Sequence, residues 1–323
     1  MSRQIQRIRK RLADGSVRVY VYDRRTREQL DPETLEPINP LTPEGGPPGS
    51  IGALCALYRQ SPEFKQLAPA TQFIYQRAMD LLAPHRDKPV AGLKRRHILE
   101  ARDANAHRPG IANQLMTVFS RLLSFAVDRE FGGIEVNVAL RVPRLKNGEW
   151  KRWTDDAIQK ALKGMPEQLR RPLILGLYTG QRLGDCLSMR WSAYDGQGIY
   201  VVQQKTGEPL FVPCHKVLKA ELDAWKKEPR VALTILANSR GQPWTMNGFK
   251  CQWAAAKRKL GIPFAFHGLR KTAAAKLAEA GCSDREIMAI TGHRTASEVE
   301  RYTREAEQRT RALSAIRKLE NGQ

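Results

Sequence analysis

The chain has 323 residues, and its 54 lysines and arginines outnumber 33 aspartates and glutamates to give a formal charge of +21. This length accommodates two or three domains, and the charge favours a polyanionic partner, nucleic acid above all, over a ribosome-associated or merely basic protein. No run of about 18 apolar residues appears, so neither a membrane span nor a secretory signal is expected. Five scattered cysteines without C-x-x-C pairing suit a reducing cytoplasm and argue against zinc or disulfides: Cys55, Cys186, Cys214, Cys251 and Cys282.

Residues 1–45 combine positive charge with a strand pattern. The stretches 5–12 and 17–22 flank Asp14-Gly15, a dipeptide typical of tight hairpin turns, and the second alternates apolar and polar residues. A basic β-hairpin is therefore predicted, either as a small edge ribbon or as a separate DNA contact. The segment 41–50, LTPEGGPPGS, is typical of a linker because proline and glycine dominate it.

Residues 50–140 predict a compact helical domain. One helix is expected to use Thr71 as its N-cap and to end near Pro84. Apolar residues at helical spacing predict a longer helix: Ile111, Leu115, Val118, Phe119, Leu122 and Ala126. The basic residues 94–96 either face DNA phosphates or form a solvated helix face.

Residues 150–323 follow a basic linker and mix helical and strand patterns. A helix is predicted after Thr154, and strands at 199–204 and 210–212 are predicted to pair around Thr206-Gly207. Helical patterns then continue to the C-terminus, with glycine breaks at Gly261, Gly281 and Gly292 and two capping-box sequences, Ser283-x-x-Glu286 and Thr295-x-x-Glu298. The fold class expected is mainly α with a small β-sheet.

This third segment also holds an ordered set of polar residues able to surround one phosphate: Arg182, Lys205, His267, Arg270, His293 and Tyr302. Singly they are weak signals, because six histidines and 54 basic residues produce roughly one H-x-x-[KR] by chance. His85-x-x-Lys88 is such a bystander. The strength lies in the combination, since guanidinium groups grip phosphate oxygens in pairs and a tyrosine can attack the phosphorus.

The local sequences around these residues resemble the tyrosine recombinase (phage integrase) family. LYTGQRLGDCLSMRW is similar to its first box, FHGLRKTAAAKLAEAG to its second, and TGHRTASEVERYTREA to its last. The boxes cover about residues 150–305. The resemblance implies a mixed α/β catalytic domain at 150–323, a helical core-type DNA-binding domain at 50–140, and an N-terminal segment at the place of an arm-binding domain.

The resemblance assigns a role to each residue. Arg182 and Arg270 align with the two family arginines, and together they stabilise the extra charge of a pentacoordinate phosphorus. His267, one helical turn before Arg270, assists proton transfer from the tyrosine or orients the phosphate. His293 binds the scissile phosphate and packs against the nucleophile.

Of the remaining two residues, one would protonate the leaving group and the other would be the nucleophile. Lys205, just before the predicted turn, donates a proton to the departing 5′-oxygen. Tyr302 forms a covalent bond to phosphorus, which conserves the phosphodiester energy so that resealing needs no ATP.

Four positions are compared with the family pattern: Asp185 stands where Glu is usual, Lys271 where His is common, Thr291 where Leu is common, and Arg304 two residues after the tyrosine, where a basic residue or His is usual. None removes a catalytic group. They leave the subfamily and the secondary contacts open.

The resulting hypothesis is a site-specific DNA recombinase, an integrase that cuts and rejoins duplex DNA through a 3′-phosphotyrosine, without cofactor or metal. Its partners would be double-stranded attachment sites, a homo-tetramer in the synaptic complex, and accessory DNA-bending or directionality proteins, in the bacterial cytoplasm or nucleoid. A chromosome-dimer resolvase, a type IB topoisomerase-like enzyme and a catalytically inactive DNA-binding relative are the alternatives. The C-terminal amphipathic helix docks either onto a neighbouring protomer or onto its own domain.

Overall fold

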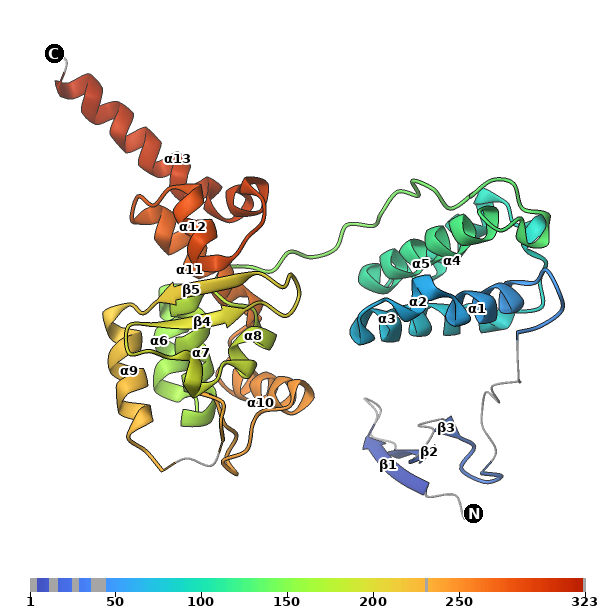
Figure 1. Ribbon diagram of the computed structural model, residues 1–323, viewed down its shortest axis with the longest axis horizontal. Helices are drawn as coiled ribbons and strands as arrows, with labels where there is room; N and C mark the ends of the chain where they lie inside the picture. Colours follow the sequence, from blue (N-terminus) through green and yellow to red (C-terminus); the bar gives the residue numbers. More distant parts are fainter. Residues whose placement is uncertain (1–4, 12–16, 25–28, 36–44, 230–231, 322–323) are drawn as a thin grey trace. The chain divides into compact units, whose positions relative to one another are not determined.

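A computed structural model describes residues 5–11, 17–24, 29–35, 45–229 and 232–321. The chain divides into two compact units, Met1–Gly148 and Glu149–Gln323, which are described one at a time (Figure 1). Helices dominate both, beside two small sheets, which confirms the predicted fold class. Among the described residues, the structure has no helix that combines the length and apolar character needed to cross a bilayer.

The N-terminal sheet consists of three antiparallel strands in the order β1 (Ile5–Arg11), β2 (Val17–Asp23) and β3 (Gln29–Leu30). The predicted hairpin is confirmed in β1 and β2, whereas the two-residue β3 was not predicted and the Asp14-Gly15 turn lies outside the described residues. Arg7 pairs with Val21 and Arg9 with Val19, so both arginines lie on one face of the sheet.

Five α-helices follow in the first unit: α1 (Ile51–Gln60), α2 (Pro62–Lys65), α3 (Pro69–Asp80), α4 (Arg95–Ala104) and α5 (Pro109–Val127), with 3₁₀ turns at Ala83–His85, Val90–Gly92 and Phe131–Gly133. The long helix predicted from apolar spacing is confirmed as α5, whose Leu115 and Leu122 are buried. The predicted N-cap Thr71 is wrong, because Pro69 already occupies the first turn of α3.

Side chains of α4 and α5 hold the segment that leaves this unit. Arg95 donates to the carbonyl oxygens of Val138 (3.3 Å) and Leu140 (2.8 Å), and Asn113 binds both backbone polar groups of Leu145. Arg95 therefore binds the protein's own backbone while it remains exposed, and both interpretations of the basic residues 94–96 stay open.

The second unit contains eight α-helices and one hairpin: α6 (Asp155–Gly164), α7 (Glu167–Thr179), α8 (Leu183–Ser188), β4 (Gly198–Val202), β5 (Pro209–Pro213), α9 (Lys216–Lys226), α10 (Met246–Lys259), α11 (His267–Glu279), α12 (Asp284–Thr291) and α13 (Ala296–Asn321). A 3₁₀ turn lies at Trp191–Ala193. Thr154 caps α6, and Ser283 with Glu286 forms the predicted capping box of α12. The other predicted capping box is Thr295-x-x-Glu298. There the Glu298 carboxylate accepts from the backbone N–H of Arg294, one residue before the predicted donor Thr295.

The core of this unit surrounds α7, whose Leu173 and Leu175 are fully buried. Aromatic rings from two segments join this core, with Phe249 stacked on Trp253 (5.3 Å between ring centroids) and set edge-on to Phe266 (5.8 Å). Phe266 directly precedes α11, so this packing fixes the start of the helix that carries His267 and Arg270.

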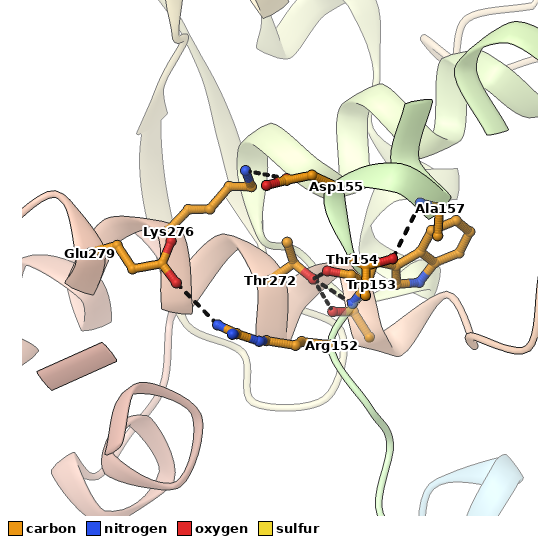
Figure 2. A network of polar contacts seen from close by, with 9 residues as sticks. Arg152, Trp153, Thr154, Asp155, Ala157, Thr272, Lys276 and Glu279 are labelled. Atoms are coloured by element: carbon orange, nitrogen blue, oxygen red, sulfur yellow. Dashed lines mark hydrogen bonds and ion pairs between the residues drawn. The ribbon is translucent and has the colours of Figure 1, made fainter. Parts of the chain in front are cut away.

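The segment entering the unit is bonded along α11 (Figure 2). The backbone N–H of Trp153 donates to Thr272 Oγ1 (2.8 Å), and its indole N–H donates to the Ala265 carbonyl (2.8 Å). Two ion pairs flank these bonds, Arg152 with Glu279 (3.0 Å) and Lys276 with Asp155 (2.7 Å). The exposed pairs add little stability, so the buried Trp153–Thr272 contact is the part that anchors α11.

Replacing Gly268 by alanine is expected to destabilise this unit by about 1–3 kcal/mol. A Cβ at Gly268 would overlap the Lys151 carbonyl oxygen and approach the Trp153 indole (2.9 Å), so backbone must move. Thermal or denaturant unfolding measures the change. Gly148→Ala is the matched control, because its Cβ would meet nothing within 4 Å; equal stability of the two variants would contradict the prediction.

Candidate active site

Arg182 is placed by the turn that joins α7 to α8. Gly180 ends α7 in the left-handed conformation (φ 63°), which a residue with a side chain rarely adopts, and Arg182 then serves as the N-cap residue of α8. The half-buried Arg182 donates from Nη1 to Oε1 of Gln203 (2.7 Å). The guanidinium is therefore aimed by a neutral amide and keeps its full charge.

Lys205 lies within the turn between β4 and β5, not just before the turn as predicted, and its side chain is exposed. The backbone of Gln203 closes this turn, accepting from the N–H of Gly207 (2.8 Å) and donating to the Glu208 carbonyl (2.9 Å). The buried carboxylate of Asp185 accepts from the Gln204 N–H (2.8 Å). The acidic residue after Arg182 thus holds the backbone beside Lys205.

His267 and Arg270 lie one turn apart in the first turn of α11. Arg270 is almost fully buried, at 1% exposure, and its Nη1 donates to the carbonyl oxygens of Gly180 (3.0 Å) and Thr291. These carbonyls belong to the two turns that precede Arg182 and His293. Arg270 therefore joins both turns to α11 as well as carrying charge into the site.

His293 follows Gly292, which ends α12 in the left-handed conformation (φ 70°). Its Nε2 accepts from Arg270 Nε (3.1 Å), and its Nδ1 lies 2.7 Å from Thr291 Oγ1, which itself donates to the Ile287 carbonyl. These roles assign the ring proton to Nδ1. Burial, then the charges of Arg270 and Arg182, lower the pKa of His293 to about 3, so the ring is neutral.

Cations converge on His267. Burial is the largest cause that lowers its pKa, followed by the charges of Arg270, Lys271, Arg182 and Lys205. A neutral imidazole ringed by positive charge leaves a site that attracts an anion and has a base able to accept a proton. The structure thus brings together five of the six residues predicted from the sequence: Arg182, Lys205, His267, Arg270 and His293.

The sixth residue, Tyr302, belongs to α13, and its side chain lies outside the described part of the structure. Its helix packs on α11 and α12 through the fully buried Val299, which joins Ala274 and Ile287 in a small core. The next residue, Thr303, is also buried. The backbone of Tyr302 is therefore held on the two helices that contribute Arg270 and lead into His293.

Folding should weaken in acid because of His293. Its pKa is about 6.5 when unfolded and about 3 when folded, so between these values only the unfolded chain gains the proton. Lowering the pH from 6.5 to 5.5 is expected to cost wild type about 1 kcal/mol more than His293→Asn, which cannot titrate, and above about pH 7.5 the contribution becomes constant. Urea unfolding at each pH measures it, and parallel pH profiles of the two proteins would contradict it.

Two buried glutamines were missed by sequence reasoning. Gln181 donates to the Ile290 carbonyl (2.8 Å), and Gln203 bridges Gln181 Oε1 (2.6 Å) and the Thr291 carbonyl (2.9 Å). Neither glutamine belongs to a motif with a distinctive spacing. The available signal was position, because Gln181 directly precedes Arg182 and Gln203 lies two residues before Lys205.

The sequence model of the phage integrase family matches residues 152–309. The integrase of Escherichia phage lambda is 30% identical over 157 residues, 45% of this chain and 44% of that protein, and the integrase of Escherichia phage HK022 is 26% identical over 239 residues, 68% and 64%. The matched parts thus span less than two thirds of either relative's length.

Solved structures share the fold. A lambda integrase dimer bound to a COC′ core site has a TM-score of 0.70 at 23% identity, covering 79% of this chain and 95% of that one. A lambda integrase tetramer bound to a Holliday junction has a TM-score of 0.68 at 22% identity, covering 87% and 91%. Because the family sequence pattern and the fold agree over the unit that holds the site, residues 152–309 form a domain of the phage integrase family of tyrosine recombinases.

Proposed function

We propose that this protein is a site-specific DNA recombinase, an integrase, that cuts and rejoins duplex DNA through a covalent 3′-phosphotyrosine. The observation that carries the proposal is geometric: Arg270 binds His293 directly and shares the first turn of α11 with His267, while Gln203 joins Arg182 to the end of α12. A chain with a net charge of +21 supplies the attraction for a polyanion.

The proposed reaction is a transesterification at one phosphodiester. The Tyr302 oxygen bonds to phosphorus while the bond from phosphorus to the 5′-oxygen breaks. His267 takes the phenolic proton, because its lowered pKa keeps it neutral and able to accept. Lys205 gives a proton to the departing 5′-oxygen, and attack by a 5′-hydroxyl in the reverse direction reseals the strand.

The arginines carry the electrostatic part of the proposal. Arg182 and Arg270 stabilise the charge that builds on the phosphate oxygens in the transition state. His293 changes its hydrogen bonding during the reaction: its Nε2 accepts from Arg270 in this structure, so it must release that bond and gain a proton before it can donate to a phosphate oxygen.

The partners follow the same proposal. Double-stranded DNA at attachment or core sites is the substrate, and four copies assemble for strand exchange, an arrangement supported by the lambda integrase tetramer bound to a Holliday junction. Accessory DNA-bending or directionality proteins assist in the bacterial cytoplasm or nucleoid. We assign the catalytic domain to 150–323.

We assign core DNA binding to residues 50–140, extended by the segment pinned to α4 and α5. A cleft beside α5 is lined by Arg121, Arg141 and Arg144 together with the hydroxyls of Thr117 and Ser120. All three arginines are exposed. Guanidinium and hydroxyl groups of this kind bind phosphate oxygens without reading sequence, which suits a domain that holds duplex DNA in place.

Deleting residues 1–45 tests whether the N-terminal sheet contacts DNA at a second, arm-type site. The truncated chain is expected to lose at least about tenfold in affinity for duplexes that carry such a site, because exposed Arg7 and Arg9 share one face of β1. Binding to isolated core duplexes should change little. Gel-shift titration on both kinds of duplex measures this, and unchanged affinity for every duplex tried would refute the arm assignment.

Covalent capture tests the proposed function. The full chain is incubated in EDTA with nicked duplexes of randomised central sequence, so that cleavage next to the nick releases a short strand and traps the protein on DNA. We expect adducts that survive denaturant, and sequencing them gives the core site. If the protein bound DNA without forming any trapped adduct, the recombinase proposal would be refuted and a DNA-binding function alone would remain.

A further inference from the structure

Gln203 is a fully buried side chain at the centre of the site. Its Oε1 accepts from Arg182 Nη1 (2.7 Å) and from the Thr206 hydroxyl (3.0 Å). Its Nε2 donates to Gln181 Oε1 (2.6 Å) and to the Thr291 carbonyl (2.9 Å). Both acceptor positions and both donor hydrogens of the amide are therefore used, by groups from three parts of the site.

The four partners come from three separate segments of the chain, and each segment contains or adjoins a proposed catalytic group. Arg182 is itself one of these groups, Thr206 is next to Lys205, and Thr291 lies two residues before His293. The approach to the last segment is close, because a Cβ on Gly292 would come within 2.5 Å of Gln203 Nε2. Gln203 thus fixes the spacing between the α7–α8 turn, the hairpin turn and the end of α12.

An amide suits this position better than the alternatives. A carboxylate would pair with Arg182 and cancel charge that the phosphate needs, and it would have no hydrogen to give Gln181 or Thr291. An apolar side chain of the same size would leave buried polar groups without their partners. Glutamine is uncharged and provides two acceptor positions with two donor hydrogens.

We propose that Gln203 is a positioning residue, which holds the Arg182 guanidinium and the turn that carries Lys205 in a fixed relative position for phosphoryl transfer. The proposal rests on the function proposed above. It implies that removing the amide weakens two steps together, the stabilisation of the charged phosphorus by Arg182 and the protonation of the leaving oxygen by Lys205.

Changing the leaving group distinguishes the contribution of Arg182 from that of Lys205. A thiolate departs without a proton donor, so a duplex with sulfur in place of the bridging 5′-oxygen bypasses the leaving-group acid and still requires stabilisation of the phosphate charge. Loss of Lys205 alone should then be repaired by sulfur, and loss of Arg182 alone should not.

The experiment measures single-turnover adduct formation on the captured core duplex, with oxygen or sulfur at the scissile 5′ position. Full-length Gln203→Met is compared with wild type, Lys205→Ala and Arg182→Ala. Gln197→Met is the matched control, since Gln197 is an exposed glutamine just before β4 while Gln203 directly follows that strand. Gln203→Asn is the second variant: it keeps a foldable polar amide, but one methylene less prevents it from reaching all four partners.

We expect both Gln203 variants to slow adduct formation on the oxygen duplex by at least about 100-fold. Sulfur should recover at least about tenfold of this loss and leave at least about tenfold unrecovered, because Arg182 stays misplaced. Gln197→Met should match wild type on both duplexes.

Three outcomes overturn the proposal: a rate within about threefold of wild type, full recovery by sulfur (a role through Lys205 alone), or no recovery by sulfur (a role through Arg182 or general destabilisation alone). A wild-type protein that forms no adduct on either duplex would instead refute the proposed function.

Discussion

Tyr302→Phe is expected to abolish covalent capture of DNA, lowering adduct formation by at least about 10⁴-fold. The substitution removes only the oxygen that would bond to phosphorus and keeps the ring. The positive charges of Arg182, Lys205 and Arg270 stay in place. DNA affinity should therefore stay within about threefold of wild type. Denaturing gels of the nicked core duplex measure the adduct, and gel shifts measure the affinity.

Tyr200→Phe is the matched control. Tyr200 is an exposed tyrosine on β4, and its ring packs on Phe211 at 4.8 Å between centroids, a contact that phenylalanine preserves. This variant should form adducts at the wild-type rate. An adduct that persists in Tyr302→Phe and disappears in Tyr200→Phe would move the nucleophile to β4, whereas persistence in both would leave a different residue of the chain as the nucleophile.

The site illustrates which features a sequence can reveal. Arg182, His267 and Arg270 were predictable because each stands in a short box in which glycine turns and helix starts fix the backbone nearby, as at Gly180. The helices were predictable for a similar reason, since buried residues of α5 recur at helical spacing. Local pattern and local geometry agree at these places.

The parts that escaped prediction depend on long-range contacts. Gln203 meets Thr291 across 88 positions of sequence, and no periodicity encodes that meeting. Arg95 illustrates the same limit: it is exposed, as its charge suggested, but no local pattern indicated that carbonyl oxygens of the segment 138–141 would accept its hydrogen bonds. The register of Lys205 was shifted because the loop between β4 and β5 begins earlier than the strand pattern indicated.

Arg182→Ala and Arg270→Ala are expected to differ in stability while sharing a loss of cleavage. Each should slow adduct formation by at least about 100-fold, since each removes one donor to the transition-state phosphate. Arg270→Ala should also cost about 2–4 kcal/mol of folding free energy, because it empties a buried position and removes donors from Gly180 and Thr291. Arg182→Ala should cost within about 1 kcal/mol, since Gln203 Oε1 keeps the Thr206 hydroxyl as a donor.

The expected difference in stability distinguishes Arg182, whose charge acts on the substrate, from Arg270, which also stabilises the fold. Urea unfolding gives the stability of each variant, and the nicked duplex gives its cleavage rate at a temperature where both remain folded. Arg258→Ala, at an exposed position of α10, removes the same charge without either loss. If Arg270→Ala proved as stable as Arg182→Ala, the carbonyl contacts of Arg270 would be incidental to folding. If the two variants lost DNA affinity and cleavage in equal measure, both arginines would be binding residues, and the transition-state role would pass to other cations of the site.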